Sequence, residues 1–183
     1  MLNDTPQWVA LYTNPRAEKK ADARLKEMGY TTYLPLQHKR HRWSDRWKCV
    51  EVPLFTSYLF AKICRKDVVP VRGAEGISFI ISWGNEPAII PDAEVEAVRR
   101  VVDADIELNV MNNSQLKIGQ RVKIVDGQFV GLEGTLISDC EEGNFCISIS
   151  GLNVALVMQI EKALLEPILE EGKKHKRHRI WEQ

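Results

Sequence analysis

Nearly every side chain is apolar in the stretch Pro53-Leu54-Phe55-Thr56-Ser57-Tyr58-Leu59-Phe60-Ala61, and aromatic residues recur along it. Aromatic and apolar side chains of this kind suit a β-strand. Pro53 fits the start or edge of a strand, where a missing N–H does no harm. Successive strand residues face opposite sides, so Leu54 and Phe55 would lie on different faces. Either the strand is buried on both faces, or one apolar face is a docking site.

Length and composition indicate one large or two small domains in 183 residues, of which 44% are hydrophobic. The chain contains no apolar run of about eighteen residues, so no membrane span is expected. The N-terminus, residues 1–6, is polar overall and lacks the apolar core of a signal peptide. The cysteines, Cys49, Cys64, Cys140 and Cys146, form no C-x-x-C motif. Reduced thiols in a cytoplasmic protein are therefore expected, rather than disulfides.

Charge is distributed unevenly along a chain that carries 25 basic and 25 acidic residues. Residues 1–48 contain ten lysines and arginines against five acids, and residues 86–171 are predominantly acidic. Basic residues return at 173–179. The asymmetry indicates that the N-terminal part faces a polyanion and that the tail has a separate role.

The N-terminal segment predicts a strand followed by a basic helix. Gln7–Thr13 is a compact apolar run, and Asn14-Pro15 offers an N-cap and a first helical residue. Apolar residues then recur at helical spacing until Gly29, which is typical of a helix end. Three basic side chains form a second stripe, either a nucleic-acid contact or a solvated face: Arg16, Lys20 and Arg24.

A tryptophan-containing basic segment follows the next expected strand, Tyr30–Leu36. The segment His38–Lys48 is too polar for a core, so we expect a projecting loop or hairpin tip. Its cations can neutralise phosphates, and its indoles can stack on unpaired bases. The alternative is a solvated loop. The residues predicted to bind nucleic acid are Arg40, Arg42, Trp43, Arg46 and Trp47.

The rest of the N-terminal part predicts an α+β plait. Asp67–Arg72 suits a short helix, and Ile77–Trp83 suits a strand. Asp92 is expected to cap a further helix, and four valines are expected on its buried side: Val95, Val98, Val101 and Val102. This order predicts helices packed on one face of a mostly antiparallel sheet.

A change in the period of the hydrophobic pattern separates the C-terminal part of the chain from the N-terminal part. The polar segment Glu107–Gln115 is expected to be a linker. Beyond it, short alternating runs are separated by glycine turns, which is typical of a small β barrel. The predicted domains are residues 1–106, a linker at 107–116, a barrel at 117–168 and a basic tail at 169–183. Val154–Glu166 is also compatible with a helix, but alternation in Arg121–Val125 and Phe145–Ser150 favours strands.

Two spans of the chain together resemble the NusG family of transcription elongation factors. One comprises Trp8-Val9-Ala10-Leu11-Tyr12, the basic helix, Pro53-Leu54-Phe55-x-x-Tyr58-Leu59-Phe60 and Pro87-Ala88-Ile89-Ile90-Pro91. The other resembles a KOW motif: Gly119-x-x-Val122-x-Ile124-x-x-Gly127-x-Phe129-x-Gly131-x-x-Gly134. The resemblance implies an NGN-like plait and an SH3-like KOW barrel. The sequences of two of these motifs, Pro53-Leu54-Phe55-x-x-Tyr58-Leu59-Phe60 and Pro87-Ala88-Ile89-Ile90-Pro91, resemble those of specialised antiterminators of the RfaH and UpxY type, which serve long polysaccharide operons. Thr56-Ser57 departs from the Pro-Gly of many housekeeping factors.

The resemblance also implies partners and sites. An aromatic patch would dock on the clamp helices of RNA polymerase: Tyr12, Phe55, Tyr58 and Phe60. Asp67 and Pro70 would contact the opposite lobe, and the basic segments would face non-template DNA or nascent RNA. Phe129 and Ile149 would contact a small-subunit ribosomal protein or Rho. Strand alternation separates Phe55 from Tyr58 and Phe60, so either a bend reorients Phe55 or only part of the set docks.

A binding factor is favoured over an enzyme, because no nucleophile arrangement, phosphate-cradling loop or paired-acid signature occurs. We expect no cofactor. His38-x-x-His41 and His175-x-x-His178 lie in cationic runs, which disfavour a metal. The alternative is an RNA-binding protein of ribosomal type, since KOW motifs also occur in ribosomal proteins.

Overall fold

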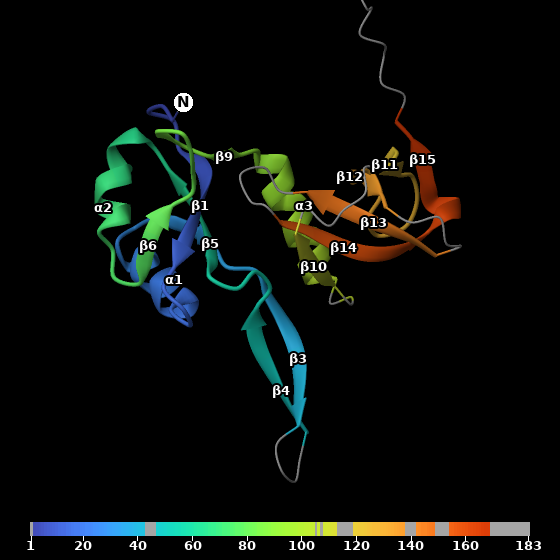
Figure 1. Cartoon of the computed structure of the whole chain (residues 1–183), viewed down its shortest axis with the longest axis horizontal. Helices are drawn as coiled ribbons and strands as arrows, with labels where there is room; N and C mark the ends of the chain where they lie inside the picture. Colours follow the sequence, from blue (N-terminus) through green and yellow to red (C-terminus); the bar gives the residue numbers. More distant parts are fainter. Residues whose placement is uncertain are drawn as a thin grey trace, which may run out of the picture.

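The computed structural model describes residues 2–42, 47–104, 106, 108–112, 119–137, 142–148 and 154–168. It is a mixed α/β fold with antiparallel sheets and few helices (Figure 1). The N-terminal sheet has the order β2 (Thr31–Tyr33), β5 (Tyr58–Ile63), β1 (Gln7–Thr13) and β6 (Ile77–Ile80). A further strand, β9 (Ile89–Ile90), also pairs with β1. The predicted strand Gln7–Thr13 is thus confirmed and lies at the centre of the sheet.

Helices cover both faces of the N-terminal sheet, so the expectation of helices on one face was wrong. On one face α1 (Glu18–Glu27) and α2 (Val68–Arg72) share a core with Val9 and Leu11. On the other face α3 (Asp92–Asp103) shares a core with Trp8 and other residues. The reason lies in β1, where residues 8–11 are all buried, and a strand that is apolar on both sides needs cover on both.

The stretch from Pro53 to Ala61 is a strand end, a turn and a new strand, so the prediction of one continuous strand was wrong. β3 (Leu36–Arg42) and β4 (Trp47–Pro53) form a separate two-stranded hairpin that projects from the body (Figure 1). Pro53 ends β4, and the Tyr58 N–H donates to the Phe55 carbonyl oxygen at 3.2 Å. The intervening apolar side chains, Leu54 and Phe55, are buried inside the turn, so their character reflects the core and not a strand.

Both predicted helix caps lie one or more residues from the actual starts. α1 begins at Glu18 after Ala17, and the Asn14 side chain accepts a hydrogen bond from Ser78 instead. α3 has Pro91 at its N-cap, with Asp92 as its first residue. The Asp92 carboxylate accepts from the Trp8 indole N–H at 3.0 Å and from the Lys62 ammonium at 2.8 Å. These bonds, the one from Lys62 foremost, lower the pKa of Asp92 and join α3 to the sheet.

Two small elements complete the N-terminal part. The 3₁₀ turn η1 (Arg65–Asp67) leads into α2, where a helix was predicted. The short hairpin of β7 (Ser82–Trp83) and β8 (Glu86–Pro87) turns at Gly84, whose φ is 60°. Trp83 is exposed on this hairpin.

The C-terminal sheet has six antiparallel strands in the order β10-β14-β13-β12-β11-β15. Their bounds are β10 (Asn109–Asn112), β11 (Arg121–Ile124), β12 (Glu133–Leu136), β13 (Glu142–Ser148), β14 (Val154–Glu161) and β15 (Leu165–Pro167), with a 3₁₀ turn, η3 (Lys162–Leu164), before β15. Alternate residues of β11 are buried, as the period of the sequence predicts. The helix-compatible segment after Val154 is also a strand. β10 falls within the segment expected to be a linker.

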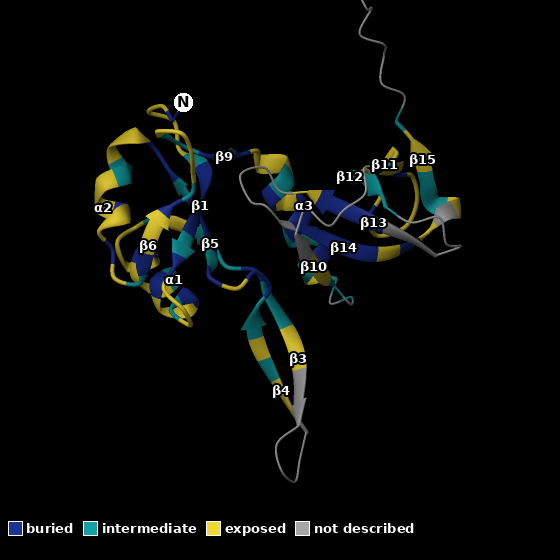
Figure 2. Cartoon of the chain, viewed as in Figure 1, coloured by how far each residue is buried: buried dark blue, intermediate teal, exposed yellow. Residues whose placement is uncertain are grey.

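Helix α3 lies between the two sheets (Figures 1 and 2). Val98 and Val101 of α3 belong to the same buried cluster as Leu132 and Phe145 of the C-terminal part. The Arg100 guanidinium donates to the backbone carbonyl oxygens of Gln128 at 3.0 Å and Val130 at 3.1 Å. One helix therefore contributes to the cores on both of its sides.

No helix in the described ranges is long and apolar enough to cross a membrane. Cys49, Cys64 and Cys146 are free thiols, and Cys140 lies outside the described residues.

Candidate functional site

Three aromatic rings gather at one end of the N-terminal sheet, on the face that also carries α3. In the strand register, Tyr12 of β1 stands directly opposite Tyr58 of β5 and Phe79 of β6. The Tyr12 ring meets the Tyr58 ring edge-on at 5.3 Å between centroids. It stacks on the Phe79 ring at 4.9 Å, and Phe79 is 45% exposed. We call Tyr12, Tyr58 and Phe79 the aromatic patch.

Two of the four aromatic residues predicted to bind polymerase lie beneath the surface. Phe55 is 2% exposed and Phe60 is 1% exposed, with their ring centroids 6.1 Å apart. The turn before β5 thus bends Phe55 back beside Phe60. Tyr33 stacks on Phe60 at 6.2 Å and is itself covered by the Arg99 guanidinium. Burial raises the pKa of Tyr33 well above its usual value.

Phe79 was not among the residues predicted from the sequence. It lies in the predicted strand Ile77–Trp83, but nothing local distinguishes it from the other apolar residues of that run. Its place in the aromatic patch depends on pairing with Tyr12, and that pairing joins strands far apart in the chain.

A groove of about 860 Å³ lies next to the aromatic patch. Phe55 and Tyr58 line it from the turn before β5, and Leu108 and Val110 line it from the segment that enters the C-terminal sheet. The groove is also lined by three basic residues: Arg16, Lys19 and Lys39. It therefore combines aromatic and aliphatic walls with three cations and one acidic residue, Glu18.

Asp67 and Pro70 lie at the opposite end of β5 from the aromatic patch. The Asp67 carboxylate accepts from the backbone N–H of Cys64 at 2.9 Å and from its thiol at 2.8 Å. These hydrogen bonds, the thiol first, lower the pKa of Asp67. Pro70 is exposed on α2. The structure thus separates these two residues from Tyr12 and Tyr58.

The basic stripe of α1 is largely paired with acids at the surface. Lys20 forms an ion pair with Glu75, and Arg24 forms one with Glu27 at 3.2 Å. Exposed pairs of this kind are worth at most about 1 kcal/mol, so a polyanion can displace the acids. Arg16 lies apart from them, at the groove.

The projecting hairpin of β3 and β4 carries a second group of basic residues. In the register of its backbone, Arg40 stands opposite Cys49 and Arg42 stands opposite Trp47. Only the backbones of Arg40, Arg42 and Trp47 are described, and Trp43 and Arg46 lie outside the described residues. At the base, Glu51 contacts His38 at 3.5 Å and Lys19 at 3.8 Å.

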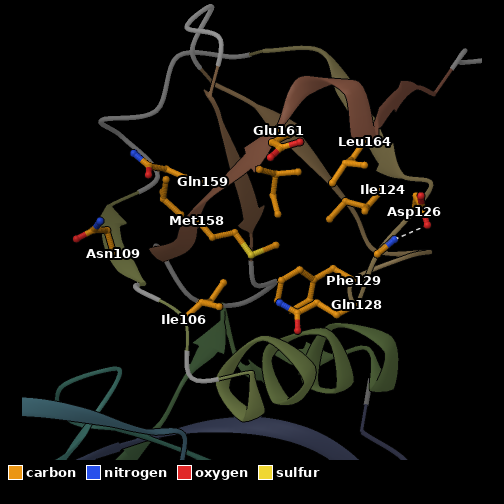
Figure 3. A pocket seen from close by; sticks show the side chains of 13 residues that line it. Ile106, Asn109, Ile124, Asp126, Gln128, Phe129, Met158, Gln159, Glu161 and Leu164 are labelled. Atoms are coloured by element: carbon orange, nitrogen blue, oxygen red, sulfur yellow. Dashed lines mark hydrogen bonds between the residues drawn. The ribbon is translucent and has the colours of Figure 1, made fainter.

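Phe129 is not available at the surface in this arrangement, against expectation. It is 6% exposed, and Arg100 of α3 binds the carbonyl oxygens on either side of it. A pocket of about 550 Å³ lies beside it, with apolar walls that include Met158 and polar residues that include Gln159 (Figure 3). Ile149 lies outside the described residues.

No set of three or more His, Cys, Asp or Glu side chains in the described ranges is arranged to hold a metal ion. Three surface features stand out in the described part of the chain: the aromatic patch, the groove beside it and the hairpin.

Comparison with known proteins identifies the relatives of this chain. The family model described as "Transcription termination factor nusG" matches residues 6–99, just over half of the 183 residues. A solved structure, "Domain interaction in Thermotoga maritima NusG", has a TM-score of 0.53 and 19% sequence identity, and the match covers 90% of this chain and 98% of that one. This likeness shows the fold.

Another similar structure is the "MjSpt4:Spt5 complex conformation A", with a TM-score of 0.30 and 14% identity over 88% of this chain and 97% of that one. The matched residues 6–99 contain β1, α1, the projecting hairpin and the aromatic patch. The chain belongs to the NusG family of transcription factors.

Proposed function

We propose that this protein is a non-enzymatic transcription elongation and antitermination factor that binds RNA polymerase. The aromatic patch carries the proposal, because Tyr12, Tyr58 and Phe79 form a stacked cluster with Phe79 exposed. Exposed aromatic clusters lose water readily and act as hot spots at protein interfaces. The patch lies within the segment that matches the NusG family model.

The polymerase contact would be made by residues 1–106, as an NGN-like domain. In this proposal the aromatic patch docks on the clamp helices, and Phe55 and Phe60 support it from beneath. Asp67 and Pro70 contact the opposite lobe of the enzyme. Their position at the far end of β5 from Tyr58 supports a domain that bridges two parts of the polymerase.

The basic hairpin and α1 would bind non-template DNA or nascent RNA. Two opposed hairpin positions, Arg42 and Trp47, combine a cation with an indole, which suits an unpaired nucleotide. Lys20 and Arg24 would supply phosphate contacts after exchanging their acidic partners.

Residues 117–168 would act as a KOW barrel that recruits a second factor, a small-subunit ribosomal protein or Rho, through Phe129 and Ile149. The two parts would meet within residues 107–116, of which β10 joins the C-terminal sheet, and a basic tail would follow at 169–183. Since Phe129 is buried in the loop that Arg100 of α3 holds, recruitment through Phe129 requires that loop to leave α3.

Within the family, the sequence motif Pro53-Leu54-Phe55-Thr56-Ser57-Tyr58-Leu59-Phe60 supports a paralogue of the RfaH and UpxY type. Such a factor would act in the cytoplasm on a long polysaccharide operon.

The proposal is tested by transcription in vitro through a terminator with the matching RNA polymerase. Added protein should raise readthrough, and the variant Phe79→Ala should raise it less. A pull-down should recover polymerase subunits. Unchanged readthrough, together with recovery of assembled ribosomes, would instead establish the RNA-binding protein of ribosomal type.

A further inference from the structure

Ser57 adopts a backbone conformation that side chains rarely take. Its φ is 63°, and in the described ranges only Arg16 is another non-glycine residue with positive φ. Ser57 is the third residue of the turn that the Tyr58 N–H closes onto the Phe55 carbonyl oxygen. A positive φ at this position is normally met by glycine, because a Cβ atom is crowded there. The turn therefore needs support from outside itself.

Glu18 provides a contact of the required kind. Its carboxylate oxygen Oε1 accepts the backbone N–H of Ser57 at 2.8 Å, and the two residues are 5% and 6% exposed. On its other side, the Ser57 carbonyl oxygen accepts the Thr13 N–H at 2.9 Å. A hydrogen bond to a charged acceptor is stronger than a neutral one, and both polar groups of Ser57 are thereby held.

Burial of the Glu18 side chain does not follow from packing. A buried carboxylate is unfavourable unless it is hydrogen-bonded, and an apolar residue would pack at the first turn of α1 without that cost. The Glu18 carboxylate accepts its hydrogen bond from the turn. The first turn of a helix also favours a negative charge, which makes Glu18 a stable acceptor there.

The turn positions two aromatic side chains. Tyr58 follows Ser57 directly and meets the Tyr12 ring edge-on, and Phe55 meets Phe60 at 6.1 Å. A change of the Ser57 peptide plane would move both side chains. The Thr13 bond also ties the turn to the residue after Tyr12.

We propose that Glu18 is a positioning residue: its carboxylate holds the turn at Ser57 in the left-handed conformation and thereby sets Tyr58 and Phe55 in the aromatic patch and its support. The inference deepens the proposed function and rests on it for its effect on polymerase binding. The effect on the turn itself is independent of any partner.

The variants that test it are Glu18→Ala, Glu18→Gln, Ser57→Gly and the double variant Glu18→Ala/Ser57→Gly. The matched control is Glu27→Ala, which removes a carboxylate from the same helix without touching the turn. Hydrogen exchange of the Ser57 amide and the ring resonances of Tyr12 and Tyr58 are measured in the free full-length protein, and polymerase affinity is measured separately.

Glu18→Ala should accelerate exchange of the Ser57 amide about tenfold or more and shift the tyrosine ring resonances, since it removes a charge-assisted hydrogen bond. Glu18→Gln, which keeps an acceptor, should do so less. In the Ser57→Gly background the loss of Glu18 should have little effect on the rings or on polymerase affinity, because glycine adopts the turn unaided. Glu27→Ala should change none of the three: Ser57 amide exchange, the tyrosine ring resonances and polymerase affinity.

Unchanged Ser57 exchange in Glu18→Ala would overturn the proposal, and so would an equally large ring shift in the Ser57→Gly background. If Glu18→Ala does not fold, the double variant decides: it should fold with native ring resonances, and failure to do so makes Glu18 a general core residue. If the wild-type protein does not bind polymerase, the proposed function fails, and the exchange and ring measurements still decide the role of Glu18.

Discussion

The ring of Tyr12 stacks on the ring of Phe79, with centroids 4.9 Å apart and planes 14° from parallel. Tyr58 meets the same Tyr12 ring at 88°, so Tyr12 is the centre of a patch assembled from three strands. The exposed member of the pair gives the most direct test of the patch.

Phe79→Ala should weaken polymerase binding by at least about 2 kcal/mol if Phe79 is a hot spot. The melting temperature should change little, because the side chain is 45% exposed. Titration of labelled protein with polymerase measures the affinity. The control Met28→Ala removes an exposed apolar side chain at the end of α1 and should bind like wild type. Equal affinities for all three proteins would exclude the patch as the docking site.

Phe60→Ala should act on the fold instead of on the contact. The residue is 1% exposed, and its truncation should lower the free energy of unfolding by about 3–5 kcal/mol. Phe55→Ala should behave in the same way. Denaturant unfolding measures the loss. A Phe55→Ala variant with native stability but weakened polymerase binding would show that Phe55 makes the contact itself.

Arg100→Ala should release the loop that contains Phe129, because it removes two hydrogen bonds to backbone carbonyl oxygens. Amide resonances of residues 128–130 should shift, and binding of a ribosomal-protein partner or Rho should strengthen. Lys123→Ala, which removes a cation from β11, is the control and should change neither. A loop that keeps its native resonances in Arg100→Ala would mean that apolar packing on α3 holds it.

Neutralising Arg40 and Arg42 should flatten the salt dependence of single-stranded DNA binding by about 0.7 in log–log slope per lost phosphate contact. Trp47→Ala should cost about 1–3 kcal/mol if a base stacks on the indole, with the slope unchanged. Fluorescence anisotropy at several salt concentrations measures both. Wild-type binding by all these variants would identify the hairpin as a solvated projection.

Asp67 should contribute to acid unfolding. Hydrogen bonds from the Cys64 thiol and N–H lower the pKa of Asp67 in the folded protein. A lowered folded-state pKa gives stability that is present above the unfolded value of about 3.9 and is lost as pH falls through the folded value. Asp67→Asn should therefore show a smaller loss of unfolding free energy than wild type below about pH 4. Parallel slopes for the two proteins between pH 5 and 2 would contradict this role.

The local pattern of apolar residues in the sequence was enough to predict several helices and strands. The spacing of Val95, Val98 and Val101 predicted the buried side of α3, and the alternation in Arg121–Ile124 predicted β11. β14 is a strand although Val154–Glu166 was also compatible with a helix. Helical and strand periods are properties of neighbouring residues, so they can be read without knowing the rest of the fold.

The tertiary structure decided where these elements meet. In the run Pro53–Ala61 only the polar pair Thr56-Ser57 hinted at the turn, because the apolar residues on either side of it are buried whether they lie in a turn or in a strand. The side of the sheet that α3 covers, the pairing of Tyr12 with Phe79 and the burial of Phe129 beside Arg100 all join segments far apart in the chain. Such choices depend on which surfaces complement each other after the chain collapses, and no local period encodes them.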